Sequence, residues 1–520
     1  MLSLLLAVAV GVAVLISTSL ARRFRIAPPA LLLLAGVLLG FLPALRAAHL
    51  PPEAVLLLFL PVLLYWESFT SSLREIRANL RVIVLLSTVL VAATAAVAAV
   101  AAHTLGLPWG PAWVLGAAVA PTDATAVGVL GRALPRRLAT TLRAESLVND
   151  GTALVIYALA VGVTMGDDEV GLANVSGLFV LAYLGGMAIG AVVAWVAVQV
   201  RRRVTDPFQH SILALATPLV AYLVAEAVEA SGVLAVVVSG LWVSRASPRL
   251  FSAETRQYVG TVMGFLTALA NAALFVLVGL EVQSAVRELS TFDLTKALLA
   301  VAAVSAAVIG VRFAWMFTSP YVIRLIDRRP VQRTRRIGAK PRTVVAAAGF
   351  RGAVSLAAAL AVPHSLPDRD VIVFVTAGVI AVTLLVQAPL MPRIVRWAGV
   401  TDDGSAEQER RRAEITAVEE AIAALPDLAG RTGASAVHAD QLREQFQQRL
   451  DLLRGDGSGA QGVARDREVR LAALAHKRAT VIRLRDEGTI DDEVLQQILE
   501  GLDFEEVQLR HHTFGDHADR

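Results

Sequence analysis

Four polar residues open one of the most apolar stretches of the chain, and their side chains could hold a proton or a cation. They are Glu145, Ser146, Asn149 and Asp150 in "ESLVND", which is followed by "GTALVIYALAVGV". On a helix with about 3.6 residues per turn they fall within an arc of about 140°. A carboxylate in apolar surroundings is costly unless it is paired, protonated or bound to a cation. We therefore expect this face to point into the protein and to bind a charged species.

A second acid lies in a similarly apolar stretch, in "APTDATAVG". Pro121 precedes Asp123 by two residues, and a proline removes one helical hydrogen bond and clashes with the turn before it. Helices broken at membrane depth occur where they line a cavity, and such breaks often build ion sites. Oxygen ligands without thiolates suit a hard cation such as Na⁺ or Li⁺. The plain alternative is a proline kink with a structural hydrogen-bond network.

Two arginines lie in apolar segments, Arg312 in "AVIGVRFAWMF" and Arg351 in "AAAGFRGAVSLAAALAVP". Each needs a counter-charge at membrane depth, and we expect Glu145 and Glu67 to provide it. That pairing would leave the two aspartates, Asp123 and Asp150, for transported ions.

Glycines flank the second of these arginines, at positions 349 and 352. Glycine weakens a helix interior, so the sequence predicts a second broken segment that crosses the first. Small residues also serve ordinary helix packing in membranes, which is the alternative interpretation.

The composition indicates a polytopic membrane protein. Of 520 residues, 56% are hydrophobic and 18% are charged, with a mean hydropathy of +0.61. The chain has no cysteine, which excludes disulfides, thiolate metal sites and thiol catalysis. No Walker A pattern is present, which argues against an ATP-driven pump, and the basic residues lie in short loops, which argues against nucleic-acid binding.

The hydropathy pattern predicts an all-α fold with about thirteen membrane-spanning helices. A spanning helix needs about 20 apolar residues. The candidates are 2–20, 28–45, 51–67, 80–104, 109–131, 139–164, 172–200, 208–228, 232–244, 258–285, 296–323, 342–361 and 370–395. Lys and Arg number 24 in one alternating set of loops and 4 in the other, which predicts an outside N-terminus and a cytoplasmic C-terminus.

The last part of the chain differs in kind. We expect a transmembrane domain over residues 1–398 and a cytoplasmic α-helical tail over 399–520, with four amphipathic helices. A regulatory or dimerising role and inert packing are equally compatible with that pattern.

With these motifs in place, the chain resembles a sodium/proton antiporter of the first monovalent cation:proton antiporter family, in the long form with a cytoplasmic tail. The matching motifs are "APTDATAV", "ESLVNDGTALVIY", "SGVLAVVVSGLWV", "ALFVLVGLEV" and "GFRGAVSLAAALAVP". The resemblance implies a homodimer in the cell membrane, inverted repeats and two unwound crossing helices, the fifth and the twelfth.

The resemblance also implies roles for individual residues. It implies Na⁺ ligands at Asp123, Ser146 and Asp150, with a backbone oxygen near Thr122. It implies support from Asn149 and from Glu145, which pairs with Arg312, while Arg351 matches the essential arginine of the family.

The mechanism we expect is secondary transport, with no cofactor beyond the transported ions. A buried aspartate holds either a proton or a cation, and a rigid-body movement exposes it to alternate sides. The Asn149–Asp150 pair resembles electroneutral members that serve pH and sodium homeostasis. Three alternatives remain: a K⁺/H⁺ antiporter on the same scaffold, a cation channel, and a membrane-anchored sensor whose output is the tail.

Overall fold

The computed structural model describes residues 2–24, 28–42, 57–78, 83–123, 136–166, 172–288, 294–326, 338–400, 405–433, 435–454, 460–487, 489 and 492–511. Within these ranges the regular elements are helices, apart from one isolated bridge between Asp123 and Phe350. The all-α class predicted from the sequence is therefore confirmed. The contacts divide the chain into two compact units, Met1–Asp403 and Gly404–Arg520.

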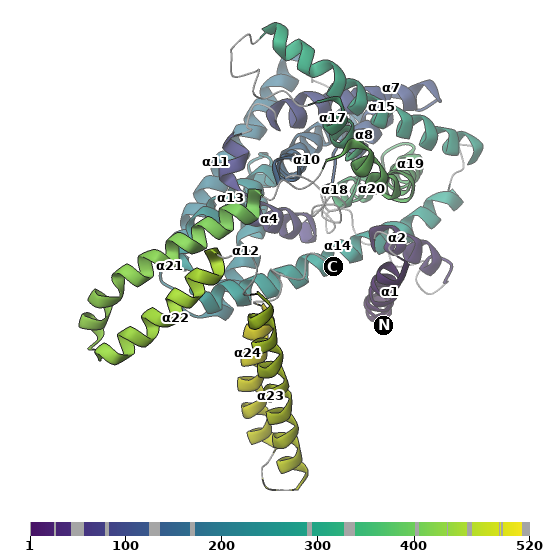
Figure 1. Cartoon of the computed structure of the whole chain (residues 1–520). Helices are drawn as coiled ribbons and strands as arrows, with labels where there is room; N and C mark the ends of the chain where they lie inside the picture. Colours follow the sequence, from purple (N-terminus) through teal and green to yellow (C-terminus); the bar gives the residue numbers. More distant parts are fainter. Residues whose placement is uncertain are drawn as a thin grey trace. The chain divides into compact units, whose positions relative to one another are not determined.

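The first unit has a helix at each of the thirteen predicted membrane segments, so far as their residues are described (Figure 1). Eight helices of the described part are long and apolar enough to span a bilayer. The count of thirteen crossings, their orientation and the inverted repeats stay predictions. The helices are α1 (Leu2–Phe24), α2 (Pro28–Leu39), α4 (Leu60–Thr70), α5 (Leu73–Ala78), η2 (Leu85–Leu90), α7 (Val91–Thr104), α8 (Trp109–Val119), α10 (Arg136–Met165), α11 (Leu172–Arg201), α12 (Pro207–Glu226), α13 (Gly232–Leu250), α14 (Ala253–Glu288), α15 (Leu294–Ile326), α17 (Ala339–Ala347), α18 (Ala353–Leu360), α19 (Arg369–Val382), η3 (Thr383–Gln387) and α20 (Ala388–Ala398).

Helices α2 and α14 touch along their backbones at a pair of glycines. A Cβ added at Gly36 would lie 2.9 Å from the Cα of Gly279, and one added at Gly279 would lie 2.7 Å from the Cα of Gly36. Without a hydrophobic driving force between helices in lipid, close packing at small residues holds such pairs together. This contact makes α2 and α14 one packed pair.

Two interrupted helices position the polar centre of this unit. Helix α8 ends at Val119, and the chain from Ala120 to Asp123 is not helical. Helices α17 and α18 are separated by the non-helical residues 348–352. The break at Pro121 and the break between the two glycines are therefore confirmed, and they bring two unwound segments into the interior of the helix bundle.

The described residues of the second unit form four helices, as the amphipathic pattern predicts. Helix α21 (Ser405–Thr432) packs against α22 (Ala436–Arg454), and α23 (Ala460–Asp486) packs against α24 (Asp492–His511). Figure 1 shows each pair as a helical hairpin. The cytoplasmic location and the role of this unit stay predictions.

Candidate functional site

The two unwound segments cross and bond to each other. The Asp123 N–H donates to the Phe350 carbonyl over 2.8 Å, and the two residues form the isolated antiparallel bridge. The N–H of Ala353, the first residue of α18, donates to Oδ2 of Asp123 over 3.3 Å. A Cβ added at Gly352 would overlap the Asp123 carboxylate, so the crossing requires glycine at this position. The predicted crossing of the two broken helices is confirmed.

The polar face of α10 points into the protein, as its spacing predicts. The exposed fractions are 1% for Glu145, 2% for Ser146, 1% for Asn149 and 3% for Asp150. The polar residues of "ESLVND" are therefore withdrawn from both water and lipid. Burial on this scale requires partners, a proton or a cation for each carboxylate.

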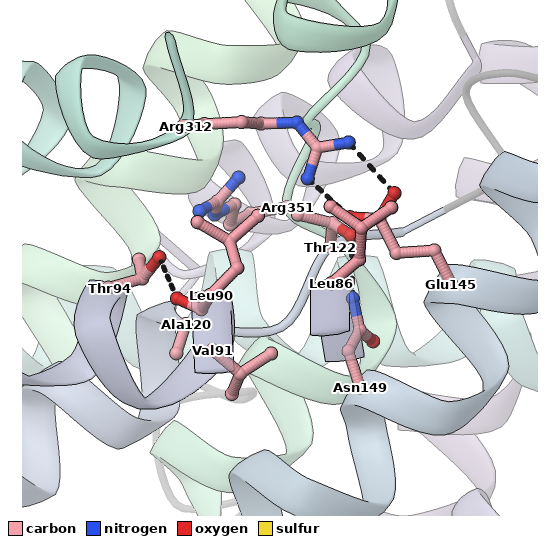
Figure 2. Close-up of a pocket in the computed structure, with 10 residues that line it drawn as sticks. All are labelled: Leu86, Leu90, Val91, Thr94, Ala120, Thr122, Glu145, Asn149, Arg312 and Arg351. Carbon is pink, nitrogen blue, oxygen red and sulfur yellow. Dashed lines mark hydrogen bonds and ion pairs between the residues drawn. The ribbon is translucent and has the colours of Figure 1, made fainter. Parts of the chain in front are cut away.

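Glu145 and Arg312 form a buried, two-pronged ion pair between α10 and α15, which Figure 2 shows. Arg312 Nη1 lies 2.5 Å from Glu145 Oε1, and Nη2 lies 3.1 Å from Oε2. The remaining Nε donates to the carbonyl of Val345 in α17 over 3.2 Å. The pairing predicted for these two residues is confirmed. It ties α10 and α15 to the helix that leads into the second break.

Arg351 does not pair with Glu67, and that expectation is wrong. Its Nε donates to the carbonyl of Val119 over 2.9 Å, and its Nη1 donates to the carbonyl of Gly349 over 2.6 Å. These carbonyls are available because both helices are interrupted there, and a broken helix leaves its last C=O groups without intrahelical partners. The carboxylate of Glu145 also lies within electrostatic reach of this guanidinium.

Glu67 belongs instead to a group of acidic side chains. Its carboxylate is hydrogen-bonded with the Ser146 side chain and interacts electrostatically with Asp123 and Arg143. The charged neighbours of Asp150 are the carboxylates of Glu67 and Asp123. Carboxylates that share a site repel each other, so a proton or a cation among them lowers the cost of their proximity. We call Glu67, Asp123 and Asp150 the acidic cluster.

Asn149 joins the polar face of α10 to the first break. Its Nδ2 donates to the hydroxyl oxygen of Thr122 over 2.6 Å, while its Oδ1 is buried and has no partner in the described structure. Both side chains line a small pocket, shown in Figure 2, whose walls come from the two breaks and from η2, α7, α10 and α15. The lining residues are Leu86, Leu90, Val91, Thr94, Ala120, Thr122, Glu145, Asn149, Arg312 and Arg351.

The apolar wall of this pocket was not anticipated from the sequence. Leu86 and Leu90 lie on η2, a stretch of π-helix that continues into α7. π-Helical turns often occur at functional sites, but they have no compositional signature that would separate them from an α-helix. Nothing in the printed sequence distinguishes these leucines from those that face lipid.

The predicted Na⁺ ligands divide between the two sides of the crossing. Asp123 lies on the first break, while Ser146 and Asp150 lie on α10. The acidic cluster is an electrostatic group: among the residues that the structure describes, no three His, Cys, Asp or Glu side chains lie close enough to ligate one metal ion together. A mixed set of carboxylate and hydroxyl oxygens suits an alkali cation that enters and leaves as a substrate.

Comparison with known proteins relates most of the chain to sodium/proton exchangers, the family that its motifs resemble. The family model described as "Sodium/hydrogen exchanger, transmembrane" matches residues 10–397. The uncharacterized Na⁺/H⁺ exchanger Rv2287 of Mycobacterium tuberculosis is 41% identical over 520 residues, covering 97% of this chain and 96% of that protein. The Na⁺/H⁺ antiporter ApNhaP of Aphanothece halophytica is 30% identical over 424 residues, covering 81% of this chain and 78% of that protein.

A solved structure shares the fold. The sodium proton antiporter MjNhaP1 of Methanocaldococcus jannaschii, determined at pH 8, superposes with a TM-score of 0.60 at 19% identity. The superposition covers 76% of this chain and 99% of that one. The matched family model spans both interrupted helices and all the polar residues gathered around them. The chain therefore belongs to the sodium/hydrogen exchanger family of membrane antiporters.

Proposed function

We propose that this protein exchanges Na⁺ or Li⁺ for H⁺ across the cytoplasmic membrane, with both ions competing for the acidic cluster. The observation that carries the proposal is the position of Asp150. This residue is 3% exposed, and its charged neighbours are two further carboxylates. Removing such a group from water is costly, and a bound proton or cation offsets that cost. Because one ion displaces the other, occupancy follows both gradients.

The residues divide into ligands and supports. Asp123, Ser146 and Asp150 supply side-chain oxygens, the backbone near Thr122 supplies another, and Glu67 adds a carboxylate through its contact with Ser146. Hard cations favour such oxygen ligands.

The supports hold the geometry of the crossing. Glu145 and Arg312 join α10 to α15, Asn149 fixes Thr122, and Arg351 joins the two breaks through the carbonyls of Val119 and Gly349. A structure held in this way can move as one body, so that the loaded site faces alternate sides of the membrane.

The remaining parts of the proposal concern stoichiometry and cellular role. At the end of "ESLVND" the chain has Asn149 beside Asp150 rather than two adjacent acids. A single carboxylate at this position supports electroneutral exchange of one proton for one cation. We further propose a homodimer that serves pH and sodium homeostasis. The tail, residues 399–520, would then lie in the cytoplasm as a regulatory or dimerising domain, and the positive-inside distribution of loop arginines supports that side.

The experiment measures cation-induced dequenching of a pH-gradient dye in everted vesicles that contain the full chain. We expect exchange with Na⁺ or Li⁺ that is lost in Asp150→Asn and kept in Glu229→Gln. Glu229 is an exposed carboxylate in the turn after α12, so its replacement controls for a general change of surface charge.

Three results would contradict parts of this proposal. Exchange that survives Asp150→Asn would remove the acidic cluster as the site. Exchange with K⁺ but with neither Na⁺ nor Li⁺ would favour the K⁺/H⁺ alternative. A large current across a planar bilayer without proton countermovement would favour a channel.

A further inference from the structure

The second break leaves main-chain groups of α17 and α18 that need partners inside the protein. An interrupted helix frees the last carbonyls before the break and the first N–H groups after it. At membrane depth these groups have no water to bond, so each needs an acceptor or donor from the protein. The residues that supply these hydrogen bonds are therefore the ones that stabilise the non-helical conformation of the break.

Three of the partners are residues already placed in the site. Asp123 donates its N–H to the Phe350 carbonyl, and Arg351 Nη1 donates to Gly349. Arg312 donates its Nε to Val345. Two further groups lie at the edges of the break: the carbonyl of Ala347, which ends α17, and the N–H of Arg351.

Both of these groups are bonded by η3, a stretch of π-helix between α19 and α20. The hydroxyl oxygen of Thr383 accepts the Arg351 N–H over 3.3 Å and donates its own proton to the Ile380 carbonyl over 2.9 Å. Gln387 Nε2 donates to the Ala347 carbonyl over 2.7 Å. Thr383 is fully buried, with an exposed fraction of 0%.

The four-residue spacing explains why two residues of one short segment reach both edges of the break. Thr383 and Gln387 are the first and last residues of η3, four positions apart, so they lie about one turn from each other on the same side. Leu385 and Val386, between them, are 55% and 58% exposed, so they lie on the opposite side.

We propose that Thr383 and Gln387 are positioning residues that hold the second unwound segment in place for ion exchange. The inference rests on the proposed function of the acidic cluster. Thr383 fixes the main chain at Arg351, two residues before Ala353, whose N–H donates to Asp123 Oδ2. By fixing this stretch of backbone, Thr383 and Gln387 orient the carboxylate of Asp123, although the described contacts show no direct bond from either residue to it.

The test compares three threonine variants in the vesicle assay. Thr383→Val keeps the shape of the side chain and removes the hydroxyl, whereas Thr383→Ser keeps the hydroxyl. The matched control is Thr376→Val, because Thr376 lies on α19, is equally buried, and has a hydroxyl with no hydrogen-bond partner in the described structure. Gln387→Leu removes the second hydrogen bond independently.

A lost buried hydrogen bond corresponds to a change of about 3- to 10-fold in the coupled equilibrium. We therefore expect Thr383→Val and Gln387→Leu to raise the apparent KM for Na⁺ by about that factor and to shift the pH profile of exchange. Thr383→Ser should restore both properties, and Thr376→Val should leave both unchanged.

Different failures have different meanings. A wild-type chain that exchanges no alkali cation for protons would overturn the proposed function itself. A wild-type chain that exchanges, with Thr383→Val unchanged in KM and pH profile, would overturn only this inference. Equal losses in Thr376→Val, or variants at both 383 and 387 that fail to accumulate while Thr376→Val accumulates, would reduce the role of η3 to packing and overturn it too.

Discussion

Two arginines of this protein each contact carboxylates, one buried in the membrane unit and one partly exposed in the tail. In the Arg312–Glu145 pair the side chains are 3% and 1% exposed, and the guanidinium also bonds the main chain at the second break. Arg478 contacts Asp503 and Glu506 between α23 and α24, where the three side chains are 32%, 61% and 18% exposed.

The difference shows that environment, rather than the pairing itself, decides what an ion pair contributes. Removing one member of a buried pair leaves an uncompensated charge in an apolar medium. An exposed pair is screened by water and salt, so its loss changes stability little. Hydrogen bonds from Arg478 to Glu506 and Asp503 still raise the pKa of its guanidinium. The first pair ties α10 and α15 to the helix before the second break, and the second joins two helices of one hairpin.

The largest effect should follow from breaking the buried pair. Glu145→Ala leaves Arg312 uncompensated, and we expect a loss of about 3–5 kcal/mol in stability together with loss of exchange. The measurement is thermal unfolding of the detergent-purified chain, followed by size-exclusion chromatography. A double variant, Glu145→Leu with Arg312→Met, removes both charges and should unfold at a higher temperature than Glu145→Ala. Equal melting temperatures for Glu145→Ala and the wild type would show that the pair is not buried as described.

The crossing of the two breaks offers the next test. Gly352→Ala adds a Cβ into the space that the Asp123 carboxylate occupies, so we expect exchange to be abolished while much of the helical structure remains. Gly310→Ala on α15 is the matched control, because a Cβ there meets nothing within 4 Å. Vesicle assays at equal protein level compare the two. An active Gly352→Ala variant would contradict the close approach of the second break to Asp123.

A smaller effect should come from breaking the partly exposed contacts of Arg478 with Asp503 and Glu506. Arg478→Ala in the full chain should leave the melting profile close to that of the wild type and leave the apparent KM for Na⁺ unchanged. Raising the salt concentration should reduce even this small difference, because exposed charges are screened. A large drop in thermal stability would show that the α23–α24 hairpin depends on this pair.

The smallest effect on ion exchange should follow from removing the tail altogether. Residues 404–520 form a compact unit of their own, so a chain that ends at Val400 should retain exchange with an unchanged apparent KM. The vesicle assay measures this directly against the full chain. Complete loss of exchange in a truncated protein that still reaches the membrane would favour the sensor alternative, in which the tail and the ion site form one switch.

The sequence predicted the parts of the site that depend on local pattern. The spacing of "ESLVND" placed four polar side chains on one face of α10, and Pro121 and the two glycines around Arg351 marked the breaks. The cost of a buried charge predicted that Glu145 pairs with one of the two arginines, and the family resemblance implied that this arginine is Arg312.

The rest depends on contacts that local sequence does not encode. Glu67 was expected to pair with an intramembrane arginine because the sequence shows only how many buried charges need partners. It does not show that Arg351 can donate to the carbonyls of Val119 and Gly349, which have no helical partner because the two helices are interrupted there. Thr383 and Gln387 lie in a segment, "TLLVQ", whose composition is that of an ordinary membrane helix. Their role depends on hydrogen bonds to main-chain groups 32 and 40 residues earlier in the chain, at Arg351 and Ala347.

The glycine contact between α2 and α14 limits how this protein can change shape. With Gly36 and Gly279 in backbone contact, sliding by even one residue would bring larger neighbouring side chains against the opposite main chain. We therefore expect these two helices to move together as one unit, with any boundary between a moving and a stationary part lying outside this pair.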